Sequence, residues 1–152
     1  MFLTGTPPQC QSKTQAFLDQ EHCLLIDGEW VPAASGKRLE VTNPATGEKL
    51  SSVAEGDSED VQRAVIAARR AFESGPWSKV TTSERGKMIW KLADLLEAHL
   101  DEFAELESLD NGKPRAVAAA ADVPLAVDLL RYMAGWATKI EGNTLPISVP
   151  YM

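Results

Sequence analysis

Cysteine and histidine are scarce in this sequence. Its 152 residues include two cysteines, Cys10 and Cys23, and two histidines, His22 and His99. A bridge between the cysteines would close only a short segment near the amino end, so we expect reduced thiols. Two histidines without ligand spacing are too few for a metal cluster. The scarcity of both residue types argues against a disulfide scaffold and against a zinc site.

Basic side chains and long apolar runs are also few. Lysine and arginine total 15 against 22 acidic residues, which gives a net charge of -7. Such an acidic chain is unsuited to binding nucleic acid or an anionic membrane. The longest apolar run, residues 116–121, is far too short to cross a bilayer. Residues 1–20 have neither the basic start nor the apolar stretch of a secretory signal, so a cytoplasmic location is expected.

What is present indicates a globular unit of one-domain size. Hydrophobic residues make up 44% and charged residues 24% of the chain, which is ordinary for such a protein. Residues 1–22 are polar and lack a sustained period, which predicts a mobile N-terminal tail. Residues 23–56 carry short apolar runs separated by turn signals at 27–28, 35–37 and 43–47. This alternation predicts a small antiparallel sheet.

Residues 57–145 are predicted to be helical. Asp57 with Asp60, and Thr81 with Glu84, have the spacing of capping boxes. In a capping box the first side chain accepts from a backbone amide three residues on, and the second side chain returns a bond to the first amide. Two helices are therefore expected to begin at these positions.

Glycine and proline indicate where the helices end. Gly75-Pro76 should stop the first, and the second should run unbroken to about Leu109, a rod of roughly 36 Å. A further helical piece begins at Pro114. Because Pro124 interrupts that piece, Asp122 is expected to cap a separate last helix.

The second and last of these helices are apolar around most of their circumference. Their polar residues form narrow stripes, and an acidic group in the second helix, Glu102, Glu105 and Glu107, is expected to be a solvated face. Helices this apolar are usually covered on several sides. Large uncovered apolar patches mark an interface or a missing neighbour, so we expect the chain to be part of a larger body.

Three segments together carry a family resemblance. They are Val41–Gly47 (VTNPATG), Leu109–Pro114 (LDNGKP) and Arg131–Trp136 (RYMAGW). In this order and spacing they resemble the N-terminal portion of NAD(P)-dependent aldehyde dehydrogenases. Residues 15–18 with His22, and residues 138–145, are similar to the phenylacetaldehyde dehydrogenase branch. The resemblance implies an α/β, Rossmann-type parent enzyme, of which this chain would be a mostly helical part with a small N-terminal antiparallel sheet.

The resemblance also implies a reaction, and it implies which part of the enzyme carries the catalytic groups. The family oxidises an aldehyde to a carboxylic acid with NAD or NADP, using a cysteine thiolate, a glutamate base and an oxyanion hole. Those groups and the main nucleotide contacts would lie beyond this chain, so we expect it to hold no catalytic and no cofactor-binding residue. It would be inactive alone and would pair with the remainder of a homo-oligomeric enzyme. Residues 57–145 would flank the dinucleotide-binding domain, and residues 146–152 would begin the strand leading to the oligomerisation region.

One candidate site remains. The resemblance implies a monovalent cation, Na+ or K+, held by the main-chain oxygens of Val41 and Thr42 and by the carboxylate of Asp110. Oxygen ligands suit such a hard cation. The alternative is that Asp110 helps to close its helix or pairs with Lys113. For the whole chain, the alternative to an enzyme fragment is a free-standing helical interaction module derived from the same family.

Overall fold

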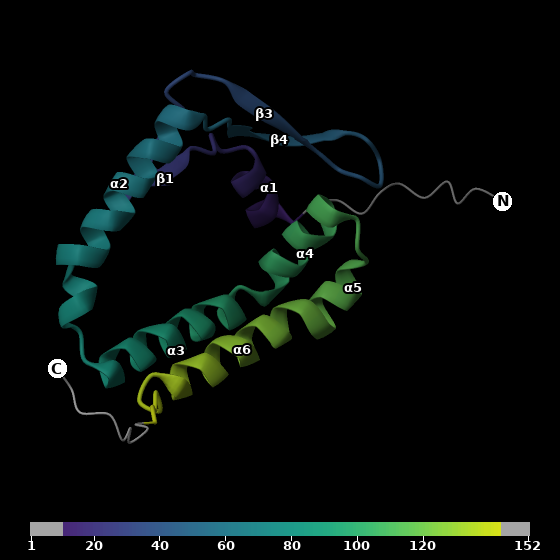
Figure 1. The fold of residues 1–152 in the computed structure, drawn as a ribbon. Coiled ribbons are helices and arrows are strands. Elements are labelled where there is room, and N and C mark those ends of the chain that lie inside the picture. Colours follow the sequence, from purple (N-terminus) through teal and green to yellow (C-terminus); the bar gives the residue numbers. More distant parts are fainter. Residues whose placement is uncertain (1–10, 144–152) are drawn as a thin grey trace.

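The structure is a computed structural model that describes residues 11–143. Figure 1 shows the elements set along three sides of a triangle rather than stacked in layers. The small strands and the first helix form one side, α2 the second, and α3 with α6 the third. In chain order the elements are α1 (Ser12–Leu18), β1 (Leu24–Ile26), β2 (Glu29–Val31), β3 (Arg38–Thr42), β4 (Lys49–Ala54), α2 (Ser58–Ser74), the 3-10 turn η1 (Pro76–Lys79), α3 (Thr82–Ala98), α4 (Leu100–Asn111), α5 (Arg115–Val117), the π turn η2 (Ala118–Asp122) and α6 (Val123–Trp136).

The predicted antiparallel strands are present, but they form two hairpins instead of one sheet. Strand β1 pairs with β2 in the register Leu25↔Trp30, and β3 pairs with β4 in the register Glu40↔Ser52. Residues Asp27 and Gly28 both have positive φ in the first hairpin turn, as a tight two-residue turn requires. A single parallel bridge between His22 and Val53 connects the two hairpins.

Part of the predicted mobile tail is structured, and residues 1–10 lie outside the described residues. Residues 12–18 form helix α1, and His22 pairs with β4, so residues 12–22 are structured rather than mobile. The reason is tertiary: Thr14 is completely buried and its hydroxyl donates to the carboxylate of Glu105 on α4. No local periodicity in this segment signals a partner so far along the chain.

Both predicted capping boxes are confirmed. At α2 the Asp57 carboxylate accepts from the Glu59 amide at 2.9 Å, and the Asp60 carboxylate accepts from the Asp57 amide at 3.2 Å. At α3 the Thr81 hydroxyl accepts from the Glu84 amide at 3.3 Å. Helix α2 ends at Ser74, before the Gly75-Pro76 pair, as predicted.

The long second helix was wrongly predicted to be continuous. It breaks at His99, whose φ of -109° and ψ of 21° are not helical, so α3 ends at Ala98 and α4 begins at Leu100. The break lets α4 change direction (Figure 1), and this carries Glu105 to the N-terminal end of α1. His99 therefore lies at a junction between two helices, with Nδ1 3.1 Å from the Glu102 carboxylate.

Pro124 does not separate two helices. The chain passes from α5 through the π turn η2 directly into α6, with the proline in the first turn of α6. A proline lacks the amide proton and its ring displaces a carbonyl four residues earlier, and a π turn is the kind of local widening that accommodates such a defect. Asp122 consequently has helical backbone angles and caps nothing with its side chain.

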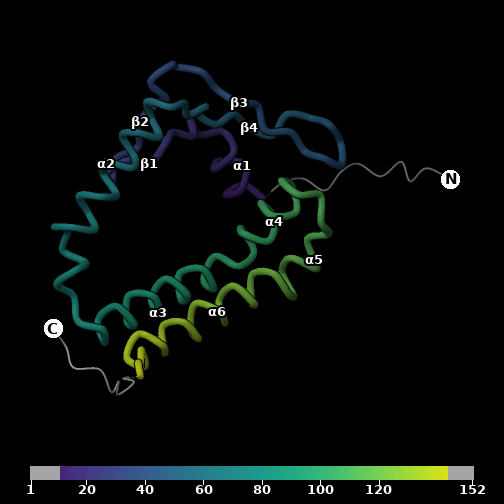
Figure 2. Tube along the Cα trace, viewed as in Figure 1, coloured from purple at the N-terminus to yellow at the C-terminus, as the bar shows by residue number. Residues whose placement is uncertain are grey.

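Helices α3 and α6 lie side by side along one edge of the molecule (Figure 2). In the described residues the buried apolar core contains only alanine and valine: Ala33, Ala54, Ala93, Ala104, Ala118, Val123, Val127 and Ala134. Large apolar side chains are exposed instead, among them Trp30, Phe72, Leu125 and Tyr132. No helix among residues 11–143 combines the length and hydrophobicity needed to cross a membrane.

Candidate functional site

The turn between α4 and α5 is built by Gly112 and Asn111. Gly112 ends α4 with φ 78°, the left-handed conformation that closes many helices. The side-chain oxygen of Asn111 accepts from the Lys113 amide at 2.8 Å, and the Ser108 hydroxyl donates to the Lys113 carbonyl at 2.6 Å. The helix stop and restart that the sequence predicts at this point is therefore confirmed.

This turn contacts the turn between β3 and β4. A Cβ atom at Gly112 would lie 3.2 Å from Cγ of Pro44. The Pro44 turn is itself closed by the Asn43 side chain, which accepts from the Ala45 amide at 2.9 Å. Two of the three segments that carry the family resemblance thus meet in space.

Lys113 does not pair with Asp110. Its ammonium group lies 2.6 Å from the carboxylate of Asp122. This hydrogen bond with Asp122 raises the pKa of Lys113, against the opposing effect of partial burial. This ion pair explains why Asp122 does not cap α6: its carboxylate binds Lys113 in the turn between α4 and α5. Because Lys113 pairs with Asp122, the alternative that Asp110 pairs with Lys113 is wrong.

Asp110 is exposed and, among residues 11–143, its side chain forms no hydrogen bond or ion pair. Its neighbour across the fold is β3: Val41 and Asp110 line the same cavity between α1, β4 and α4. Thr42, the third residue of the predicted cation site, follows Val41 in β3 but does not line that cavity. Two of the three residues thus line one cavity, and cation binding remains a prediction.

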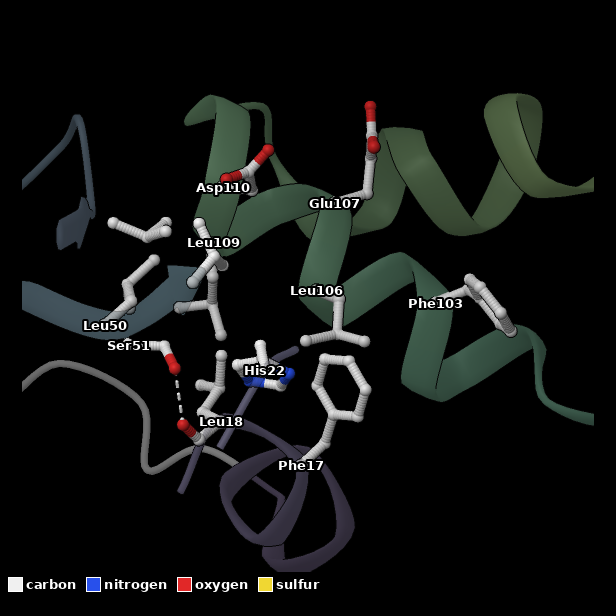
Figure 3. A pocket seen from close by; sticks show the side chains of 12 residues that line it. Phe17, Leu18, His22, Leu50, Ser51, Phe103, Leu106, Glu107, Leu109 and Asp110 are labelled. Carbon is white, nitrogen blue, oxygen red and sulfur yellow. Dashed lines mark hydrogen bonds between the residues drawn. The ribbon is translucent and has the colours of Figure 1, made fainter. Parts of the chain in front are cut away.

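The cavity has a volume of about 390 Å³ and is mainly apolar. Figure 3 shows Phe17, His22 and Leu106 turned toward one another at its centre, while Glu107 and Asp110 lie at its edge. The Phe17 and His22 rings are 4.8 Å apart. The Ser51 hydroxyl donates to the Leu18 carbonyl at 2.7 Å, so this polar group of the wall is already satisfied. Such a wall can hold apolar groups, and its titratable side chains are His22, Glu107 and Asp110.

Metal sites built from clustered side chains, and dinucleotide sites, need arrangements that the described residues do not provide. No group of three or more His, Cys, Asp or Glu side chains in this part of the chain could hold a metal ion. Both hairpins are antiparallel, whereas the dinucleotide fold needs parallel strands and a glycine-rich turn before a helix. Residues 11–143 do not by themselves contain that strand–turn–helix unit, and we assign no hydride-transfer step to them. Cys23 is half-buried next to β1; Cys10 lies outside the described residues.

One structurally central group was misassigned from sequence. Glu105 was expected on a solvated acidic face with Glu102 and Glu107, yet it is only 9% exposed. Its carboxylate accepts from the Gln11 amide and the Thr14 hydroxyl, both more than ninety positions earlier in the chain. No short-range signal in the sequence connects residues this far apart.

The profile of the aldehyde dehydrogenase family matches residues 30–151. The chain is 51% identical over 128 residues to the mitochondrial benzaldehyde dehydrogenase of Antirrhinum majus, covering 84% of this chain and 24% of that protein. It is 49% identical over 129 residues to the phenylacetaldehyde dehydrogenase of Pseudomonas fluorescens, covering 85% of this chain and 26% of that one.

The fold is shared as well. The NAD+ complex of the aldehyde dehydrogenase from Bacillus cereus superposes with a TM-score of 0.87 at 52% sequence identity, covering 92% of this chain and 28% of that chain. The chain thus spans only about a quarter of the length of the relatives it matches. From its sequence and its fold, this chain belongs to the aldehyde dehydrogenase family.

Proposed function

We propose that this chain is the N-terminal portion of an enzyme that oxidises an aldehyde to a carboxylic acid with NAD or NADP, and that it acts there as a structural element. The catalytic cysteine, the glutamate base and the nucleotide site would be supplied by the rest of that enzyme. The complete enzyme would be a homo-oligomer, and residues 57–145 would flank its dinucleotide-binding domain. Residues 146–152, which would lead to the oligomerisation region, lie outside the described residues.

The observation that carries the proposal is the apolar stripe of α2. Val61, Val65 and Phe72 follow helical spacing on one face and are 60%, 57% and 77% exposed. Within the described residues, α2 contacts only β1 and η1 appreciably. A stripe of this kind normally faces a core, and monomeric proteins rarely leave one uncovered. The relatives have about three quarters of their length beyond the matched part, which is where a covering body would come from.

The test is a chimera. The 152-residue chain replaces the matching part of the Bacillus cereus aldehyde dehydrogenase, and aldehyde-dependent formation of reduced nicotinamide is measured. We expect activity from the chimera and none from the 152-residue chain alone. Turnover by the isolated chain would overturn the structural role proposed for it.

Two matched variants test the α2 stripe. Phe72→Asp places a charge on the stripe, whereas Gln62→Asp places the same charge on the polar flank of the same helix. In the chimera we expect Phe72→Asp to abolish soluble, active enzyme and Gln62→Asp to leave it intact. If neither variant affects the chimera and the isolated chain is a monodisperse monomer that binds no hydrophobic dye, the alternative of a free-standing interaction module is favoured.

We also propose that Val41, Thr42 and Asp110 hold a monovalent cation in the complete enzyme. The support is the cavity that Val41 and Asp110 share and the absence of a partner for Asp110 among residues 11–143. Thermal unfolding of the chimera in K+, Na+ and choline chloride tests this. We expect K+ or Na+ to raise the midpoint, and Asp110→Asn to remove that increase. Equal midpoints in all three salts would contradict the site.

A further inference from the structure

Helix α1 lacks an N-terminal cap of its own. The residue before it, Gln11, makes no side-chain capping bond. Glu105, from helix α4, acts as the cap instead. The Gln11 amide donates to both of its carboxylate oxygens, at 3.1 and 3.2 Å. The Thr14 hydroxyl donates to the same carboxylate. A carboxylate at this end of a helix satisfies free amide groups and interacts favourably with the helix dipole.

The contact is buried. Thr14 is 0% exposed and Glu105 is 9% exposed. A buried carboxylate is costly unless hydrogen-bond donors surround it. Within residues 11–143, the hydrogen bonds that reach Glu105 all come from Gln11 and Thr14 at the start of α1. Glu105 and α1 therefore depend on each other.

The other end of α1 is anchored separately. The Ser51 hydroxyl of β4 donates to the Leu18 carbonyl at 2.7 Å (Figure 3). Between the two anchors, Phe17 and Leu18 form one wall of the apolar cavity described above. The helix has seven residues, well below the length at which a helix is stable alone in water. Its structure must come from these contacts.

We infer that α1 is a strap latched across the cavity by Glu105, and that it opens as a unit while the helices α3 and α6 stay folded. Opening removes the Phe17 and Leu18 wall and exposes the cavity between β4 and α4. The strap is a conformational device of this chain and does not depend on the function proposed for the complete enzyme.

Trypsin cleavage after Lys13 reports on the strap. Lys13 is exposed, but the next residue, Thr14, is buried, so cleavage between them requires α1 to open. In the 152-residue chain we expect Glu105→Ala to raise the rate of this cleavage about tenfold or more, because hydrogen bonds to a charged group are lost. Thr14→Val, which removes one donor and keeps the shape, should raise it less.

The matched control is Glu107→Gln. This residue is on the same helix, but its carboxylate binds Asn111 within α4 and its side chain points away from Phe17 (Figure 3). It should leave the Lys13 cleavage rate unchanged. Cleavage after Lys87 and Lys91 in α3 measures opening of the remaining fold and should not rise in any of the variants.

Two results would overturn the strap. One is an unchanged Lys13 rate in both Glu105→Ala and Thr14→Val. The other is a parallel rise at Lys13 and in α3, because α1 would then open only when the whole chain unfolds. If Glu105→Ala is too unstable to fold, the milder Thr14→Val variant is used, and its cleavage rate after Lys13 is compared with its cleavage rate in α3. Hydrogen exchange gives an independent measure: the exchange rate of the amides of residues 12–18 is compared with that of the α6 amides, and faster exchange in residues 12–18 reports opening of α1 alone.

Discussion

Gly86 on α3 lies against the carbonyl oxygen of Ala134 on α6, so closely that a Cβ atom at position 86 would be 2.9 Å from that oxygen. Alanine favours a helix over glycine by about 1 kcal/mol, but here its methyl group would push the two helices apart. Overpacking of this kind costs about 1–3 kcal/mol. We expect Gly86→Ala to lower the free energy of unfolding, measured by urea denaturation followed by circular dichroism.

The control for this prediction is the second glycine of the same helix pair. A Cβ atom at Gly135 on α6 would meet only the Lys139 ammonium, at 3.6 Å. Gly135→Ala should therefore be neutral or stabilising by up to about 1 kcal/mol. A stabilising effect of both substitutions would show that the α3–α6 contact is looser than the structure indicates.

Arg131 is the main polar connection across the same helix pair. Its guanidinium donates to Asp94 at 3.1 Å and to Glu97 at 2.5 Å, and it lies 5.5 Å from the Trp90 ring centre. The side chain is 26% exposed, so solvent screens it less than an ordinary surface pair. We expect Arg131→Met to lower the free energy of unfolding measured by urea denaturation, because hydrogen bonds to two carboxylates are lost.

Arg69→Met is the comparison for Arg131→Met. Arg69 pairs with Glu73 one turn away at 3.7 Å, and both side chains are more than 60% exposed. Exposed pairs contribute between zero and about 1 kcal/mol. Equal losses in the two variants would mean that the Arg131 cluster contributes no more than a surface ion pair.

Much of the local structure could be predicted because it depends on neighbouring residues. The two capping boxes, the Asp27-Gly28 turn and the Gly112 helix stop each arise from chemistry within a few positions. The wrong predictions concern features that depend on residues far apart in the sequence. The docking of α1 depends on contacts between Glu105 and residues at the far end of the chain. The break at His99 redirects α4 so that Glu105 can reach them.

In the candidate site, too, the local turns could be predicted from the sequence, whereas the contacts between elements could not. The sequence alone indicates turns at Asn43–Gly47 and Leu109–Pro114, but only the family resemblance connects Val41 with Asp110. The structure supplies what neither local chemistry nor the resemblance predicted, namely the apolar cavity that both residues line and the Lys113–Asp122 pair. Side-chain partners across elements depend on how the helices pack, and helical periodicity carries little information about that.

The first turn of α3 should weaken in acid. Hydrogen bonds from the Thr81 hydroxyl, at 2.7 Å, and from the Thr81 amide, at 3.0 Å, lower the pKa of Glu84 below its ordinary value of 4.5. A carboxyl whose pKa is lowered on folding stabilises the fold above its unfolded pKa, and this contribution disappears as the pH falls through the folded pKa. The stabilisation by Glu84 is therefore complete at neutral pH and is lost below about pH 4.5.

Comparison of the chain with its Glu84→Gln variant measures this effect. Their difference in unfolding free energy should be present at neutral pH and should shrink steadily on acidification below the ordinary pKa of glutamate. Because other carboxylates titrate equally in both proteins, the difference isolates Glu84. A difference that stays constant down to strongly acidic pH would contradict the role assigned to its charge.

Gly112→Ala should be more damaging than the same change at Gly36. Both glycines have positive φ, 78° and 69°, so alanine in either place meets the strain of the left-handed conformation, about 1–2 kcal/mol. At Gly36 a Cβ atom would have nothing within 4 Å, whereas at Gly112 it would lie 3.2 Å from Cγ of Pro44. The excess loss of unfolding free energy in Gly112→Ala therefore measures the contact between the two turns. Equal losses would mean that the Pro44 turn moves aside freely, in which case β3 and Asp110 are not held together by this contact.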